Sequence, residues 1–312
     1  MLGSAVHSAL PAIDFSRHAG LLDHALLKRA HIACVGVGGA AGLVASLARA
    51  GIGRFTLVDH DHVAPTNPAT QAHDAADIGM HKVEALRRRL ERINPAVNLA
   101  ALPKHYADLS RQEHNELWRA DVMLAMTDHF PTQAAVNRDA IERGPDAIFA
   151  LCYIGCDAFD ITATFRDSIV AGFGCHRCHA KARYDAYASG FENPSVIASH
   201  ALTAEHLNAL LGLLVVSRLH QRASSPLAIS SIASAFARRP CLIGRINPAL
   251  PSTEGANVIP QLAGPFAAQL YGLDSPSDWT CPDCGTRGVV PPTSEFQRPL
   301  ANPGPGTTQE RS

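Results

Sequence analysis

Short hydrophobic runs alternate with longer amphipathic segments through the first half of the chain. The apolar runs predict strands at residues 32–37, 55–58, 97–102, 121–126 and 147–152. Apolar residues at helical spacing predict helices between them, at residues 43–50, 80–93, around 110–117 and 131–142. Because strands and helices alternate, we expect a mostly parallel, doubly wound α/β sheet over residues 31–150.

The pattern changes after residue 150. Residues 151–165 predict a strand pair with one polar face, which begins an antiparallel half. Leucines and valines predict a helix at 201–221, whereas 180–200 has the composition of a loop and 226–250 includes strand candidates. We therefore expect a flexible start at 1–11, a nucleotide half at 12–150, a second half at 151–290 and a disordered tail at 291–312.

A glycine turn follows the first predicted strand. Gly36, Gly38 and Gly39 lead into a helix of small residues, and the next strand ends at Asp59. This is the Rossmann-like nucleotide fingerprint, in which glycines admit phosphate at a helix N-terminus and an acid binds ribose hydroxyls. An ordinary strand-to-helix turn is the alternative, but the flanking strands and the acid favour a nucleotide, of which NAD is the usual one.

The residues after Asp59 favour ATP instead. They form an ordered set in Asp59-His-Asp61, Asn67 to Gln71, Gly79-Met-His-Lys82 and Ile93-Asn-Pro95. This set resembles the ThiF and MoeB family of adenylating enzymes, relatives of the enzymes that activate ubiquitin-like proteins. The resemblance covers residue 12 to about residue 220 and resumes at a C-terminal cysteine pair.

The resemblance implies a role for each matching residue in binding ATP. Asp59 would hold the ribose beside Gly36, Gly38 and Gly39, and Asn67 and Gln71 would help to hold the phosphates and the loop. Asp61 would be a further residue of the ATP site.

Three charged residues would act on the reacting phosphates. Lys82 would neutralise them, Asp128 would hold Mg²⁺, and Arg17 would reach the partner's ATP across a homodimer interface. Taken singly, Lys82 and Arg17 could be solvated surface residues, and Asp128 could be a helix N-cap.

The sequence departs from the family pattern at three charged positions. Thr70 and Gln133 stand where arginines are expected, and Ala125 stands where an acid is common. One lost charged contact is worth about 1.5–3 kcal/mol, which predicts weaker ATP binding or slower adenylation.

Four of the eight cysteines form two CxxC pairs, Cys175/Cys178 and Cys281/Cys284. Two such pairs are typical of a closed, structural tetrahedral zinc site, and ThiF-like proteins carry pairs at these two places. A redox role is disfavoured because neither pair is expected to begin a helix after a thioredoxin-like strand. We expect the flanking residues His176 and His179 at the surface.

The other cysteines are not expected to be nucleophiles. Cys34, Cys152 and Cys156 fall on predicted strands, where we expect them to be buried and inert, and Cys241 begins a strand pattern. Adenylation without a thioester on the protein's own cysteine fits better.

Composition sets the remaining limits. The chain has 312 residues, 46% of them hydrophobic, with 27 basic and 28 acidic residues, so no charge draws it to nucleic acid or a membrane. No signal peptide and no apolar run of about 18 residues is evident, and we expect a cytoplasmic protein.

We therefore predict an adenylyltransferase that uses ATP, Mg²⁺ and structural Zn²⁺. Its substrate would be the C-terminal carboxylate of a small ubiquitin-like or sulfur-carrier protein or a peptide. The alternatives are a catalytically impaired member that binds a ubiquitin-like protein, and an NAD-dependent oxidoreductase.

Overall fold

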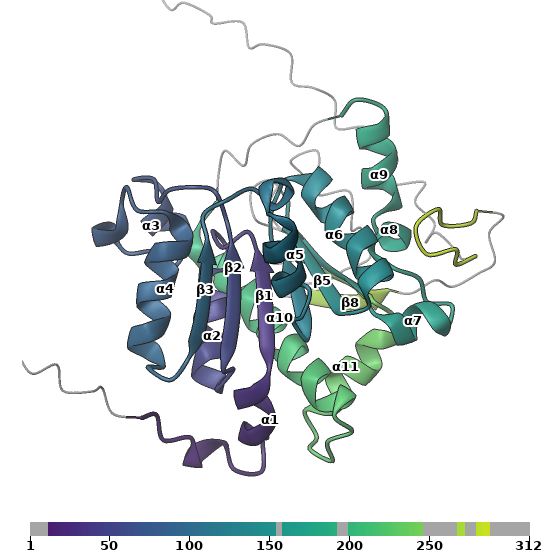
Figure 1. The fold of residues 1–312 in the computed structure, drawn as a ribbon. Helices are drawn as coiled ribbons and strands as arrows, with labels where there is room; N and C mark the ends of the chain where they lie inside the picture. The colour runs from purple at the N-terminus through teal and green to yellow at the C-terminus, as the bar shows by residue number, and fades with distance from the viewer. Residues whose placement is uncertain (1–11, 154–157, 192–198, 246–266, 272–278, 288–312) are drawn as a thin grey trace, which may run out of the picture.

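The computed structural model describes residues 12–153, 158–191, 199–245, 267–271 and 279–287. The expected flexible start, the disordered tail and Cys156 lie outside these residues. Within them, eight strands form one sheet in the order β3-β2-β1-β4-β5-β6-β7-β8 (Figure 1). The strands are β1 (His31–Val35), β2 (Arg54–Val58), β3 (Asn98–Leu102), β4 (Val122–Ala125), β5 (Asp146–Cys152), β6 (Ala158–Thr164), β7 (Cys241–Arg245) and β8 (Ala267–Tyr271).

The sheet is parallel from β3 to β5 and antiparallel from β5 to β8. This confirms an α/β fold with a mixed sheet, parallel in its first half and antiparallel in its second. The α-helices are α1 (His24–Arg29), α2 (Ala41–Ala50), α3 (Asn67–Thr70), α4 (Lys82–Ile93), α5 (Arg111–Leu117), α6 (Phe130–Arg143), α7 (Arg166–Val170), α8 (His176–His179), α9 (Lys181–Ala188), α10 (Ala201–Arg222) and α11 (Ser230–Ala237). Short 3₁₀ helices are η1 (Ser16–His18), η2 (Ala75–Asp77) and η3 (Tyr106–Asp108).

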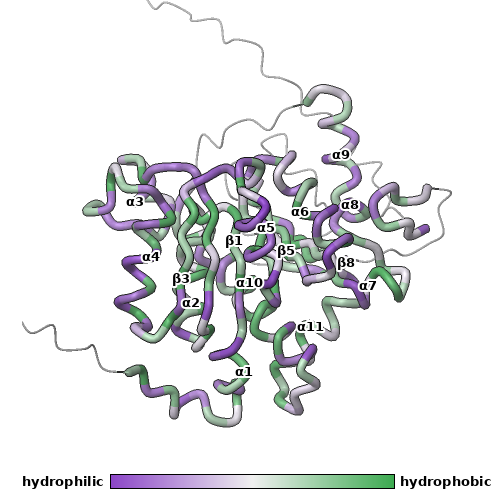
Figure 2. Tube along the Cα trace, viewed as in Figure 1, coloured by the Kyte–Doolittle hydropathy of each residue, from purple (hydrophilic) through white to green (hydrophobic). Residues whose placement is uncertain are grey.

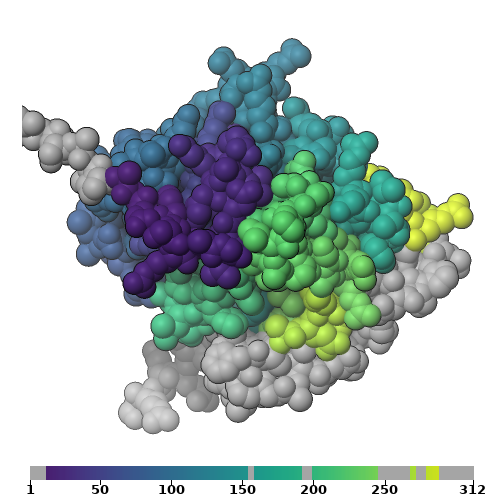
Figure 3. Space-filling view, turned by 90° about the horizontal axis from the view of Figure 1, so that it is seen from below, coloured from purple at the N-terminus to yellow at the C-terminus, as the bar shows by residue number. Residues whose placement is uncertain are grey.

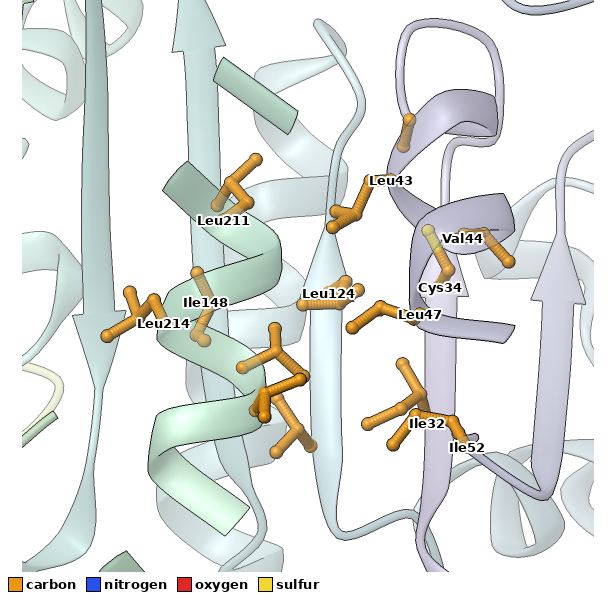
Figure 4. Packing of buried hydrophobic residues seen from close by; sticks show 14 of the residues in the cluster. Ile32, Cys34, Leu43, Val44, Leu47, Ile52, Leu124, Ile148, Leu211 and Leu214 are labelled. Carbon is orange, nitrogen blue, oxygen red and sulfur yellow. The ribbon is translucent and has the colours of Figure 1, made fainter. Parts of the chain in front are cut away.

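Strand residues alternate between two hydrophobic cores. On one face, Ile32 and Cys34 of β1 pack with α2, α4 and α10, where Leu43, Leu47 and Leu211 lie against the sheet (Figure 4). On the other face, residues of β1, β4 and β5 pack with α5, α6 and the segment around Tyr106. The parallel strands β1, β2, β4 and β5 are therefore covered on both sides, which explains their apolar runs in the tube of Figure 2, whereas the edge strand β3 is partly exposed.

Helix α10 packs across the core that contains Ile32 and Cys34. Among the helices that the structure describes, it alone is long and apolar enough to span a membrane, but 56% of its apolar window is buried in the molecule. Its Arg218 forms ion pairs with Asp146, at the start of β5, and with Asp167 of α7. These contacts identify α10 as a core helix, which fits the predicted helix at 201–221.

The N-terminal segment packs at the other end of α2 from the glycine turn. His220 of α10 accepts a hydrogen bond from the Asp23 amide at 2.9 Å, so α1 lies beside the end of α10. Figure 3 shows the purple N-terminal segment next to the green segment of α10 and α11.

One prediction for the second half was wrong. Residues 181–188 form helix α9 rather than a loop, because Tyr187 stacks on Phe130 of α6 and Tyr184 packs edge-on against the same ring. The strand candidates within 226–250 are confirmed by β7, whereas residues 230–237 form helix α11, since Ala233 and Phe236 are buried one helical turn apart beside α10.

Candidate functional site

The candidate site lies where the order of the sheet reverses. β1 and β4 are neighbours, but the chain leaves β1 for α2 on one face and β4 for α6 on the other. This leaves a crevice at the carboxyl ends of the two strands, the place where open α/β sheets bind ligands. In Figure 1 these ends are the arrowheads of the strands.

The glycine turn is held in shape from two sides. Gly36 has a φ of +85°, and a Cβ there would lie 2.8 Å from the Met126 backbone, so only glycine fits. Asp59 accepts hydrogen bonds from the amides of Val37, at 2.8 Å, and Asp61, at 2.9 Å. The carboxylate at the end of β2 thus fixes the backbone of the turn that follows β1.

A cavity of about 490 Å³ opens at this edge. It brings together most of the predicted nucleotide-binding residues, namely Gly36, Gly38, Gly39, Asp59, Asp61, Gln71, Lys82 and Asp128. Gln71 lies close over Gly38, where a Cβ would come within 3.1 Å of its side-chain amide. The cavity volume is in the range of ordinary small-molecule sites.

Lys82 is not a solvated helix residue. Its side chain is 10% exposed, and its ammonium forms an ion pair with Asp61 at 2.8 Å. Partial burial would raise the pKa of Asp61, but the hydrogen bond and charge of Lys82 hold that pKa below its usual value. A buried lysine and an ionised carboxylate therefore stand together on the cavity wall.

Asp128 lies in the turn between β4 and α6. The alternative that it caps α6 is wrong, because His129 is the N-cap residue and makes no side-chain capping bond. The turn is closed instead by the Thr127 hydroxyl, which accepts a hydrogen bond from the His129 amide at 3.1 Å. Asp128 lines the cavity beside the glycine turn.

Two predicted residues lie outside the cavity wall. Asn67 begins α3, where its side-chain oxygen accepts a hydrogen bond from the Ala64 amide at 2.8 Å and stabilises a turn. Arg17 is exposed in η1, next to Phe15, which lies near Gly51 at the C-terminal end of α2. Arg17 is therefore at the opposite edge of the sheet from the cavity of its own chain.

The cavity also contains residues that the sequence analysis did not assign to it. His60 and His105 line it and stack with ring centroids 3.5 Å apart, and Lys104 lies beside them. His60 lies between Asp59 and Asp61 in the sequence, and this position could have indicated that it lines the cavity. Cys152, the last residue of β5, lines the cavity and is half-buried, so the expectation that its thiol is buried is wrong.

The four cysteines of the CxxC pairs form one cluster. Sulfur–sulfur distances are 4.0 Å for Cys175–Cys178, 3.9 Å for Cys175–Cys281 and 3.6 Å for Cys178–Cys284. A tetrahedral zinc ion with Zn–S bonds of about 2.3 Å places its sulfurs about 3.8 Å apart. The donor set and its spacing therefore fit zinc.

Polar residues anchor this cluster to the fold. Asp283, between the C-terminal cysteines, accepts hydrogen bonds from Asn137 of α6 at 2.8 Å and from Arg177 at 2.7 Å. Asn137 also points its amide at the Cys175 sulfur, at 3.7 Å. Such contacts orient ligands around metal sites.

Two details of the cluster differ from expectation. His176 is fully buried, because it stacks on Phe149 and bonds to Thr162, so it is not a surface residue. Cys175 directly precedes the one-turn helix α8, so one of the pairs does begin a short helix. The preceding element is nevertheless helix α7 rather than a strand, and joining the two pairs into one cluster is typical of metal binding.

Comparison with known families identifies a match to most of the chain. The family model described as ThiF family matches residues 13–233. The sulfur carrier protein adenylyltransferase of Thermus thermophilus is 32% identical over 130 residues, which are 41% of this chain and 47% of the relative. The tRNA threonylcarbamoyladenosine dehydratase of Escherichia coli is 44% identical over 72 residues, 22% of this chain and 27% of the relative. The chain thus spans less than half the length of these curated relatives.

Solved structures support the fold. Escherichia coli MccB with SeMet MccA has a TM-score of 0.58 at 21% identity, covering 84% of this chain and 68% of that chain. The structure of SeMet PaaA has a TM-score of 0.52 at 16% identity, covering 72% of this chain and 63% of that chain. At these identities the likeness concerns the fold alone.

We predict that Gly36→Ala lowers the free energy of unfolding by at least about 2 kcal/mol, because the methyl group meets the Met126 backbone at a positive φ. Urea denaturation measures this change. Gly39→Ala is the matched control, since its Cβ meets nothing within 4 Å, and should stay within about 0.5 kcal/mol of wild type. Equal stability of the two variants would contradict the described packing of the turn.

Proposed function

Because the chain belongs to the ThiF family, we propose that it is an ATP-dependent adenylyltransferase. Its substrate would be the C-terminal carboxylate of a small sulfur-carrier or ubiquitin-like protein, or of a peptide. The observation that carries this proposal is the cavity in which the glycine turn, Lys82 and Asp128 meet. The likeness to a sulfur carrier protein adenylyltransferase supports the choice of substrate class.

In this proposal the glycine turn and the start of α2 receive the ATP phosphates. No side chain caps the N-terminus of α2, so its amides and the helix dipole can face an anion. Asp59 takes the ribose hydroxyls. Its two oxygens each accept one backbone N–H, and an ionised carboxylate has lone pairs left for further donors.

The charge of the cavity wall supports a role for a metal ion. Asp59, Asp61 and Asp128 line the same cavity, where an ATP triphosphate would meet carboxylate repulsion. Mg²⁺ would offset this repulsion and would supply positive charge beside the reacting phosphates. Asp128 would hold this ion, and Lys82 would contribute a second positive charge beside the phosphates.

The reaction then follows from the position of these groups. A carboxylate oxygen of the substrate forms a bond to the α-phosphorus, and the bond from that phosphorus to the bridging oxygen of the β-phosphate breaks. The products are an acyl-adenylate and pyrophosphate. Because the attacking carboxylate is already ionised, this step needs no general base. Lys82 stabilises the charge that accumulates on the departing phosphates.

Arg17 would act in trans within a homodimer. Arg17 is exposed at the far edge of the sheet, so it cannot reach ATP bound in the cavity of its own chain. A guanidinium from a second copy could instead fork across two phosphate oxygens. Asn67 would act indirectly, by holding the turn before α3.

The division of labour between the halves is part of this proposal. Residues 12–150 would bind ATP, and residues 151–290 would bind the substrate in a cytoplasmic enzyme.

A purely binding role for an impaired member is not favoured, although Thr70 lines the cavity where the family pattern has arginine. Lys82, Asp128 and the glycine turn remain together there. With a net charge of −1, an RNA substrate has no electrostatic support either.

We also propose a structural zinc ion bound by Cys175, Cys178, Cys281 and Cys284. Four thiolates leave no open coordination position, so the ion would fasten the C-terminal pair to the fold rather than catalyse a reaction.

We predict that calorimetry detects ATP binding that Mg²⁺ strengthens. Asp128→Asn should weaken the binding of Mg²⁺-ATP by at least about tenfold, because a contact with a charged group is lost. The control Asp185→Asn removes an exposed carboxylate of α9 that pairs with Lys181 and should not change the affinity. Binding of NAD but not of ATP would contradict the proposal and favour the oxidoreductase alternative.

For the zinc site, we predict one zinc ion per purified chain by elemental analysis. Cys281→Ser should lose the ion and lower the melting temperature, because the second pair is then no longer fastened. Cys152→Ser, outside the cluster, should retain zinc. Zinc-free protein with four readily titrated cluster thiols would show that the cluster binds no zinc.

A further inference from the structure

A buried glutamine supports the turn that carries Asp128. Gln133 lies in the first turn of α6 and is 1% exposed. Its side-chain NH₂ group donates a hydrogen bond to the Thr127 carbonyl at 2.8 Å and lies 3.4 Å from the Ala150 carbonyl. Gln133 therefore binds the backbone directly before Asp128, from the inside of the protein.

A buried arginine contacts the other end of the same amide. Arg183 of α9 donates a hydrogen bond to the Gln133 side-chain oxygen at 3.1 Å. Its second amino group forms an ion pair with Asp160 of β6, which also accepts a hydrogen bond from the Tyr153 hydroxyl at 2.9 Å. Both members of the ion pair are largely buried, with side chains 15% and 8% exposed.

The chemistry of arginine fixes the orientation of the glutamine. A primary amide can rotate by 180° and exchange its oxygen and nitrogen, but a guanidinium has donors and no acceptor. Arg183 can therefore bond only to the amide oxygen, which leaves the NH₂ group facing the Thr127 carbonyl. The charge of Arg183 also polarises the amide and strengthens the bond at its other end.

Other contacts also hold this turn. The Met126 amide donates to the Val35 carbonyl at 2.8 Å, and the Thr127 hydroxyl accepts from the His129 amide. The Thr127 amide also lies against Gly36, where a Cβ would come within 2.9 Å. A shift of Thr127 would therefore move Asp128 and the glycine turn together.

We propose that Arg183 is a positioning residue that acts through Gln133 to hold the turn carrying Asp128 in its binding conformation. The catalytic part of this inference rests on the proposed function, in which Asp128 binds Mg²⁺. Arg183 itself is absent from the cavity lining, so it would act without touching ATP. The pair Gln133–Arg183 connects α9 of the second half to the nucleotide site of the first.

The test uses two changes that break the chain of contacts at different points. Gln133→Glu keeps a partner for Arg183 but has no donor for the Thr127 carbonyl. The double change Arg183→Met with Asp160→Asn removes both buried charges together, so neither is left unpaired. Lys181→Met is the matched control, because Lys181 is on the same helix and, among the carboxylates that the structure describes, pairs with exposed Asp185 alone.

Two quantities are measured on the full chain. Hydrogen exchange of the amides at residues 126–130 should become about tenfold faster in Gln133→Glu and in the double variant, but not in Lys181→Met. The strengthening of ATP binding by Mg²⁺ should fall by about tenfold in the same two variants, whereas ATP binding without Mg²⁺ stays at the wild-type level. A general loss of stability would weaken both kinds of binding alike.

The outcomes separate this inference from the proposed function. Wild-type exchange at residues 126–130 in a folded Gln133→Glu protein overturns the inference, whatever the double variant does. Faster exchange together with wild-type dependence on Mg²⁺ overturns the catalytic part of it. If the wild-type protein binds no ATP at all, the proposed function fails, and the exchange measurement still decides whether Arg183 positions the turn.

Discussion

The close approach of two backbone turns organises this molecule. Gly36, at the end of β1, lies against Met126 and Thr127, at the end of β4, with no room for a side chain between them. The contact is possible because β1 and β4 are parallel neighbours whose chains leave for opposite faces of the sheet. The cavity, the helix N-terminus of α2 and Asp128 all take their positions from it. Asp59 completes the arrangement, since its carboxylate holds the amides on the other side of the turn.

The sequence was sufficient for features that depend on local pattern. Buried parallel strands are continuous apolar runs, so β1, β2, β4 and β5 could be located to within one or two residues. The glycine turn and Asp59 followed from their spacing along one strand–helix–strand unit. The two CxxC pairs are 106 residues apart, yet they were correctly predicted to form one cluster, because four thiols together suit a single metal ion.

Features that depend on contacts between distant segments were missed. Helix α9 has only a weak pattern of its own and forms because Tyr184 and Tyr187 pack against the Phe130 ring. His176 was expected at the surface because it is polar, yet its ring stacks on Phe149 inside the protein. Arg183 gave no signal at all, since nothing in its neighbourhood in sequence points to Gln133, 50 residues earlier. The distance of Arg17 from its own cavity likewise depends on where the N-terminal segment packs.

Helix α6 connects the turn that carries Asp128 to the cysteine cluster. Gln133 in its first turn holds the segment before Asp128, and Asn137, one turn later, contacts both Cys175 and Asp283 of the cysteine cluster. A single rigid helix thus touches the proposed catalytic turn and the proposed zinc site. The family pattern has arginines where this chain has Thr70 and Gln133. Because Gln133 supports the turn at its position, the site can stay ordered without an arginine there.

The central claim is that this cavity transfers adenylate rather than hydride. The most direct measurement is the exchange of labelled pyrophosphate into ATP, with a small sulfur-carrier protein ending in Gly-Gly as the carboxylate. We predict exchange that requires Mg²⁺ and the carrier and that is lost in Asp128→Asn. Adenylation is reversible, so labelled pyrophosphate can replace the released pyrophosphate and react with the acyl-adenylate while that intermediate stays bound. Absence of exchange, together with tight binding of NADH, would contradict the central claim.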